Sequence, residues 1–254
     1  MNPGSIDFLA PLRITGADAA GFLHGQITTD VTGLAPGQTG FSAWCDPKGR
    51  VIATFILARL EQTFWLLLPH TLKETFMTRM KMYVLRADVN IVDAGAAEER
   101  IPELPTYVAA MDDCGWEATF IRHGIPWITP ATSGRFLPQE LKLEHLDALS
   151  YTKGCYPGQE IIARLRFRGQ VKRGVCHAVT DNSTLLAPGA GLALAGDEKN
   201  IGTVVNSVGT DKGQELLVVL EHDHIEAGKV VARDFPDCLL QVYGSFHTSI
   251  SSAH

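Results

Sequence analysis

The chain has 254 residues, and its 22 Lys and Arg against 28 Asp and Glu give a formal net charge of −6. Hydrophobic residues make up 45% and charged residues 20%, which is typical of a globular protein and excludes a disordered one. No apolar run reaches the roughly 18 residues of a membrane span, and the N-terminus lacks the features of a signal peptide. We therefore expect a cytoplasmic protein without membrane contact.

The N-terminal half predicts alternating strands and helices. Asp46-Pro47-Lys48-Gly49 separates two apolar runs, and Pro at the second turn position with Gly after it favours a type I turn, so we expect a hairpin. Thr15 or Gly16 is the expected cap of the first helix. Residues 13–15 are predicted to be the end of a strand, and residues 41–45, 51–60, 64–68 and 89–92 are predicted strands. The predicted helices span 17–23 and 71–85.

The C-terminal half has a different sequence pattern. Residues 93–115 predict a linker, and Phe136–Leu149 predicts a short helix from its leucine spacing. After about residue 170, strand-like runs alternate with Gly, Asn and Asp clusters, which indicates a small antiparallel barrel or sandwich. These runs are 175–179, 202–208, 216–220 and 230–232.

The spacing of the cysteines predicts neither a zinc site nor a self-contained iron–sulfur cluster. There is no Cys-x-x-Cys, so we expect no permanently bound metal, and we expect most thiols to be buried and inert. The five residues are Cys45, Cys114, Cys155, Cys176 and Cys238.

Residues 153–173 hold six cations and one anion, a local charge of +5 inside an acidic protein. In an extended conformation the guanidinium groups of Arg164, Arg166 and Arg168 would share one face and suit carboxylates or phosphates. The alternative is a solvated basic strand. Cys155 lies in the same segment beside Gly154, where the backbone turns, and nearby cations favour a reactive thiolate over a buried, inert thiol.

The segment Lys153-Gly-Cys155-Tyr156-Pro-Gly158-Gln159-Glu160 resembles the K-G-C-[YF]-x-G-Q-E signature of the YgfZ-type folate-binding proteins, relatives of the glycine-cleavage T-protein. The resemblance keeps its order over roughly residues 10–235. It includes Thr15-Gly-Ala-Asp18-Ala, Phe22-Leu-His-Gly25-Gln26, Asp30-Val31, Cys45-Asp-Pro-Lys48-Gly49-Arg50, Tyr83-Val-Leu-Arg86, His123-Gly124-Ile125-Pro126 and Ser133-Gly134-Arg-Phe136-Leu-Pro138-Gln139.

This resemblance implies an α+β fold, with a T-protein-like folate-binding domain of mixed sheets and packed helices over residues 1–170. A C-terminal antiparallel β-barrel over 171–245 and a flexible tail over 246–254 would follow. It also implies tetrahydrofolate or a derivative as cofactor, and a role with iron–sulfur assembly factors or client enzymes, including tRNA-modifying ones.

Residue by residue, the resemblance carries Cys155 over as a redox or transient cluster thiol at the mouth of the folate cleft. We expect Glu160 or Gln159 to bind the pterin edge and Tyr156 to stack on the ring, whereas we expect Phe167 to be a core residue. The expected cofactor-binding set is Lys153, Tyr156, Gly158, Gln159, Glu160, Arg164 and Arg166. We assign no function to His24.

Two departures from the family pattern bear on function. T-proteins carry adjacent aspartates where this chain has Ala53 and Thr54, so the aminomethyl-transfer step lacks its carboxylate. Residues 93–122 are also a shortened version of the family's segment, which puts folate affinity in question.

Three functional hypotheses follow. The first is a folate-binding accessory protein for iron–sulfur enzymes that is not itself a conventional enzyme. The second is a folate-dependent aminomethyl or one-carbon transferase, and the third is a tRNA-binding module. The tRNA contact would use Arg164, Arg166, Arg168, Lys172 and Arg173.

Overall fold

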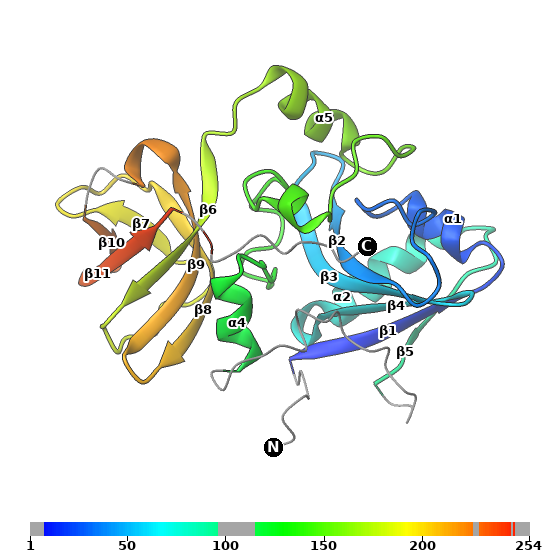
Figure 1. Cartoon of the computed structure of the whole chain (residues 1–254), viewed down its shortest axis with the longest axis horizontal. Helices are drawn as coiled ribbons and strands as arrows, with labels where there is room; N and C mark the ends of the chain where they lie inside the picture. The colour runs from blue at the N-terminus through cyan, green and yellow to red at the C-terminus, as the bar shows by residue number, and fades with distance from the viewer. Residues whose placement is uncertain (1–7, 96–114, 226–228, 245, 247–254) are drawn as a thin grey trace.

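Five N-terminal strands form one antiparallel sheet in the order β2-β3-β4-β1-β5 (Figure 1). The computed structural model describes residues 8–95, 115–225, 229–244 and 246. The strands are β1 (Leu9–Thr15), β2 (Thr39–Cys45), β3 (Val51–Leu60), β4 (Thr63–Pro69) and β5 (Asn90–Asp93).

Helices pack around this sheet and complete the mixed α+β unit. Helix α2 buries Leu72, Phe76 and Met80, whose spacing of four residues places them on one face. The helices of this unit are α1 (Ala19–His24), α2 (His70–Val84), α4 (Trp116–Arg122), η1 (Leu143–Leu146) and α5 (Gln159–Arg168). Every helix in the described ranges is too short or too polar to cross a membrane.

The β2–β3 hairpin confirms the predicted turn. The amide of Gly49 donates to the carbonyl of Asp46 at 2.9 Å, and Gly49 has a φ of +75°, the left-handed conformation that glycine adopts without strain. The Asp46 carboxylate also accepts hydrogen bonds from the amides of Lys48 and Arg50. Local turn chemistry therefore fixes this hairpin.

Two helix predictions are wrong in detail. The predicted helix over 136–149 is reduced to the single turn η1, because Lys142 and Asp147 on either side adopt left-handed backbone conformations. Neither Thr15 nor Gly16 caps the first helix, since Asp18 occupies the N-cap position and makes no side-chain cap. Most of the predicted linker over 93–115 lies outside the described residues.

Six C-terminal strands close into a barrel in the order β10-β11-β6-β9-β8-β7. The strand-like runs between Gly, Asn and Asp clusters predicted a small antiparallel barrel or sandwich here. Within it, Leu216, Val218 and Leu220 of β9 point into the barrel core. The alternate residues Leu217 and Val219 join the core of the N-terminal unit. The elements are β6 (Arg173–Thr180), β7 (Gly191–Leu194), β8 (Gly202–Thr210), β9 (Gly213–Glu221), η2 (His222–His224), β10 (Val230–Ala232) and β11 (Phe235–Tyr243).

Glu140 joins the hairpin, the loop before η1 and the barrel. Its side chain is only 8% exposed and lies 2.9 Å from an Arg173 guanidinium nitrogen and 3.4 Å from that of Arg50. The carboxylate also accepts the Leu137 amide at 2.8 Å, and the Glu140 carbonyl accepts the amide of Val175 in β6 at 2.9 Å. One residue thus contacts three parts of the chain.

We expect the Glu140→Ala variant to lose about 1–3 kcal/mol of unfolding free energy, because two guanidinium groups and an amide lose their shared acceptor. Urea denaturation measures this loss. The control is Lys199→Ala, which removes an exposed ion pair with Glu221 and is expected to cost at most about 0.5 kcal/mol. Equal stabilities of the two variants would contradict the role assigned to Glu140.

Candidate functional site

Residues 150–158, here named the signature loop, pack against the β2–β3 turn through Gly158. A Cβ at this position would lie 2.5 Å from the Cα of Gly49 and 2.6 Å from the carbonyl oxygen of Asp46. Gly158 also has a φ of +81° and is the N-cap of α5. The motif therefore requires glycine here for the close approach of two backbones.

Lys153 anchors the other end of the signature loop. Its side chain is buried, and its ammonium donates to the carbonyls of His24, Ile27 and Thr29, the last two at 2.6 and 2.9 Å. Burial lowers the pKa of Lys153 to about 8, against the opposing effect of Asp30. All three donors of the ammonium are therefore engaged within the protein.

Tyr156 and Gln159 hold the loop from within. Tyr156 is buried, and the centre of its ring lies 5.0 Å from the Lys153 ammonium nitrogen. Its hydroxyl donates to the Ser150 carbonyl at 3.3 Å. The Gln159 amide donates to the Lys153 carbonyl at 3.2 Å. Burial raises the pKa of the Tyr156 phenol well above its usual range. The two side chains brace the loop beneath its surface.

Cys155 is exposed between these buried neighbours. It is a free thiol, whereas Cys45, Cys176 and Cys238 are free but buried. Burial raises the pKa values of Cys45 and Cys176, so both favour the thiol form. Cys114 lies outside the described residues. In the described part of the chain, Cys155 is therefore the thiol that a second molecule can reach.

The basic segment after the loop is helical, so the prediction of an extended strand is wrong. In helix α5 a spacing of two residues turns side chains away from each other, and Arg166 does not share a face with Arg164. Arg166 lies 2.7 Å from a carboxylate oxygen of Glu144 and over the Tyr151 ring. The helix leaves the side chains of Glu160, Arg164 and Arg168 exposed.

Two other expectations about this segment change. Phe167 is 73% exposed rather than a core residue, although its ring lies edge-on to Tyr151. Arg173 lies in β6 and binds Glu140, whereas Lys172 remains exposed. The helix therefore exposes an aromatic ring as well as cations. Two of the cations counted from the sequence, Arg166 and Arg173, form internal ion pairs.

The strand position that carries aspartates in T-proteins is buried and already hydrogen-bonded. The Thr54 hydroxyl donates to the Pro126 carbonyl at 2.8 Å and accepts the Ile128 amide at 3.1 Å. Ala53 is 1% exposed. In this chain Thr54 therefore links strand β3 by hydrogen bonds to the segment after α4. Within the described ranges, no three His, Cys, Asp or Glu side chains form a group that could hold a metal ion.

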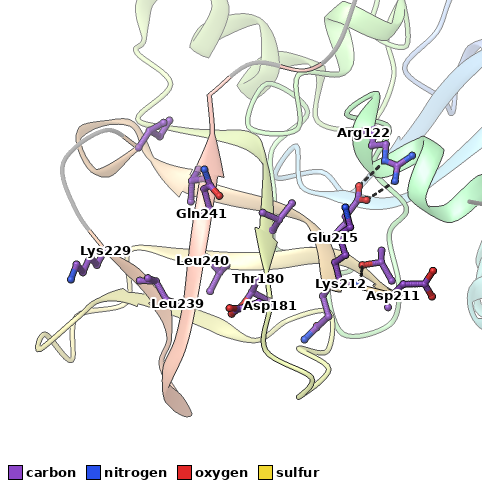
Figure 2. A pocket seen from close by; sticks show the side chains of 16 residues that line it. Arg122, Thr180, Asp181, Asp211, Lys212, Glu215, Lys229, Leu239, Leu240 and Gln241 are labelled. Carbon is purple, nitrogen blue, oxygen red and sulfur yellow. Dashed lines mark hydrogen bonds and ion pairs between the residues drawn. The ribbon is translucent and has the colours of Figure 1, made fainter.

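A cavity of about 1150 Å³ lies at the barrel, and Figure 2 shows side chains that line it. At the edge formed by α4, Arg122 donates to Glu215 through two hydrogen bonds of 2.8 and 2.6 Å. No residue of the signature loop or α5 lines this cavity. The residues expected to bind folate are therefore separate from it.

Two residues to which the sequence analysis gave no role lie beside the signature loop. A His24 ring nitrogen lies 3.3 Å from the Asp30 carboxylate, and the other ring nitrogen faces Gly154. Both residues belong to the N-terminal motif residues, and this was the one sign in the sequence that they could matter. They lie more than 120 positions before Cys155 in the sequence, so the sequence alone did not show that they are near the loop.

Several known proteins are similar to this chain in sequence or in fold. Residues 5–99 match the family model described as the GCVT N-terminal domain. A protein from Enterobacter sp. named tRNA-modifying protein YgfZ is 29% identical, covering 89% of this chain and 87% of its own. Its namesake from Shigella sonnei is 28% identical with the same coverage, and an uncharacterised Haemophilus influenzae protein is 29% identical, covering 84% and 86%.

The chain is a YgfZ-like GCVT-domain protein.

The fold of this YgfZ-like protein is that of a known enzyme of the glycine cleavage system. The crystal structure of aminomethyltransferase T from Bartonella henselae matches it with a TM-score of 0.70. The match covers 94% of this chain and 84% of that one at 13% sequence identity. The mixed α+β unit followed by an antiparallel barrel is therefore the fold that the resemblance implied.

We expect Gly158→Ala to cost the YgfZ-like protein about 2–4 kcal/mol of unfolding free energy, because the new methyl group meets backbone atoms that cannot rotate away. Urea denaturation tests this. Gly21→Ala in α1 is the matched control: its Cβ meets nothing within 4 Å, and it is expected to be neutral or to gain up to about 1 kcal/mol. A Gly158→Ala variant as stable as this control would disprove the steric argument.

Proposed function

We propose that this chain is a folate-binding accessory protein that supports the assembly or repair of iron–sulfur enzymes, including tRNA-modifying ones. The observation that carries the proposal is the exposed Cys155 thiol in a loop whose neighbours Lys153 and Tyr156 are buried and hydrogen-bonded. A thiol presented from a fixed loop suits transient contact with a partner. The relatives named tRNA-modifying protein YgfZ support the link to tRNA modification.

The thiol would act together with ligands from another molecule. A single thiolate does not complete the coordination of an iron–sulfur cluster, which takes four protein ligands. An exposed thiol can contribute one ligand, or reduce or exchange with a partner's sulfur, and then release it. In this proposal Cys155 contacts an assembly factor or client enzyme, and the chain holds no cluster of its own.

Tetrahydrofolate would bind beside the signature loop, on the exposed face of α5. Glu160 and Arg164 lie one helical turn apart, and both side chains are exposed. A carboxylate suits the amide-like edge of a pterin, and a guanidinium suits the carboxylates of the glutamate tail. The donor set thus fits a folate. When bound, a reduced folate supplies a one-carbon carrier, and these residues would bind and orient it.

The transferase hypothesis is disfavoured by the environment of Thr54. Its hydroxyl is buried between two backbone groups, and strand β3 has no carboxylate that could act at a folate nitrogen. The shortened segment 93–122 lies largely outside the described residues, so its effect on folate affinity is a matter for titration.

We expect Arg164→Ala to weaken binding of a reduced folate by about 10–100-fold, the effect of losing one charge-assisted hydrogen bond. Cys155→Ser is expected to bind as the wild type does. Fluorescence or calorimetric titration measures this. Arg79→Ala, which removes the same charge from an exposed position on α2, is the control. Equal affinity of the two arginine variants would contradict the assigned folate contact.

The same variants separate the thiol from the cofactor in a deletion strain. Cys155→Ser is expected not to restore the activity of iron–sulfur enzymes in the deletion strain, even though the variant binds folate. Full rescue by this variant would remove the thiol role, whereas detectable aminomethyl or formyl transfer by the purified protein would favour the transferase.

A second candidate function is tRNA binding at α5, which the exposed ring of Phe167 favours. Arg164 and Arg168 of the same helix and Lys172 after it are also exposed, and aromatic rings flanked by cations bind unstacked bases and phosphates. Arg166 and Arg173 contribute less, because each is paired with a glutamate.

If tRNA binds here, its affinity is expected to fall with salt by about 0.7–0.9 log units per log unit of salt for each phosphate contact. The double variant Arg164→Ala/Arg168→Ala is expected to flatten this slope by the equivalent of about two contacts. A filter-binding assay with bulk tRNA measures both slopes, with Arg79→Ala as control. A slope unchanged by the double variant would locate tRNA binding elsewhere.

A further inference from the structure

The chain leaves helix α2 through a turn that holds Leu85 in a conformation that leucine seldom adopts. The amide of Ala87 donates to the carbonyl of Val84 at 2.8 Å, and Leu85 between them has a φ of +42° and a ψ of −102°. These angles are close to those of the second residue of a type II′ turn, where glycine is favoured because a Cβ is strained. A leucine therefore stands where the fold alone would favour glycine.

Packing of the Leu85 side chain does not offset this strain. The side chain is 89% exposed, so it adds almost nothing to either hydrophobic core. Met82 is 63% exposed, and Tyr83 is 46% exposed with its ring edge-on to Trp44. Three large apolar side chains are thus exposed within four residues, whereas exposed apolar residues on protein surfaces are ordinarily scattered singly. A strained and exposed cluster of this kind indicates a role outside the fold.

Two exposed cations flank these apolar side chains. Lys81 precedes them and Arg86 follows them, and neither forms an ion pair with a residue in the part of the chain that the structure describes. The next carboxylate along the chain, that of Asp88, accepts the amide of Ala17 at 3.1 Å. The surface is therefore apolar and cationic in a protein of net charge −6. We name it the α2 patch: Lys81, Met82, Tyr83, Leu85 and Arg86.

Helix α1 connects the α2 patch to the signature loop. Before α1 begins, the amide of Asp18 donates to the carbonyl of Asp88 at 3.1 Å. At the other end of α1, the carbonyl of His24 accepts the ammonium of Lys153. The helix has six residues and is about 9 Å long. A protein interface of ordinary size, about 800 Å² on each partner, is wide enough to span this helix.

We propose that the α2 patch docks an acidic segment of the partner protein that uses Cys155, with an apolar side chain of that segment packed on Leu85. The carboxylates of such a segment suit the unpaired Lys81 and Arg86, and the contact removes the exposed leucine from water. Complementary charge speeds the encounter, and a buried apolar anchor slows dissociation.

The composition of the α2 patch favours a protein over a nucleic acid. Phosphate groups would pair with Lys81 and Arg86, but a phosphate backbone offers no apolar partner for Met82 and Leu85. An acidic segment with an apolar side chain satisfies both kinds of group. The basic segment of α5, in contrast, exposes an aromatic ring on which a base can stack.

This inference deepens the proposed function and rests on it, because the docked partner is the protein that Cys155 serves. The Cys155→Ser variant in the deletion strain tests the function with the α2 patch unchanged. Full rescue by that variant, together with docking at the patch, would contradict the thiol role and leave the docking surface intact. Failure of that variant to rescue, together with no effect of changes in the patch, would contradict the docking alone.

The test is photo-cross-linking in the deletion strain that carries the full chain with p-benzoylphenylalanine at position 82. We expect a cross-link to one protein, at an acidic segment identified by mass spectrometry. The double variant Lys81→Glu/Arg86→Glu is expected to weaken the cross-link by at least about 10-fold, because like charges then face each other. The control Lys212→Glu/Arg233→Glu reverses two exposed cations of the barrel and is expected to leave the cross-link unchanged.

A cross-link of equal strength in the charge-reversed variant and its control would overturn the proposal. The absence of a discrete product would also overturn it, as would a cross-link to RNA, to lipid or to a second copy of this chain.

Leu85→Gly tests the role of the leucine without dependence on a variant that fails to fold. The midpoint of urea unfolding is expected to rise, because glycine relieves the strain of the turn, while the cross-link from position 82 weakens. A lower midpoint would show that Leu85 serves the fold, and an unchanged cross-link would show that it anchors no partner. Either result would overturn the proposal.

Discussion

The position of the signature loop depends on a buried carboxylate. Glu140 lies between the guanidinium groups of Arg50, which follows the hairpin turn, and Arg173, which begins the barrel. Removing a charge of this kind from water is unfavourable unless its hydrogen bonds are satisfied, and here two arginines and an amide satisfy them. Gly158 rests on the turn that Arg50 follows, so Glu140 ties this turn and the loop packed on it to the start of the barrel.

Much of the fold could be predicted because its signals are local. The Asp46–Gly49 turn is fixed by its own side chains, and the barrel strands follow from alternating apolar runs between turn residues. Helix α5 was mistaken for a strand because alternate arginines suit an extended chain as well. Ala163, Leu165 and Arg166 are strong helix formers, and a helix that begins at Gln159, after the N-cap Gly158, satisfies that propensity.

The candidate site could be predicted only in part. The motif located Cys155, but the burial of Lys153 depends on carbonyls at residues 24–29, which no local pattern connects to it. For the same reason Lys153 was counted among the accessible cations, and His24 was left without a role. Phe167 was expected in the core, because hydrophobicity alone does not show which face of a helix lacks a covering element.

Strand β9 has a mechanical consequence for how the molecule can move. Its successive residues Leu216 to Leu220 are fully buried, alternately in the barrel core and in the core of the N-terminal unit. A hinge between the two units would have to pull apolar side chains out of one core, so rotation of the barrel as a rigid body is strongly opposed.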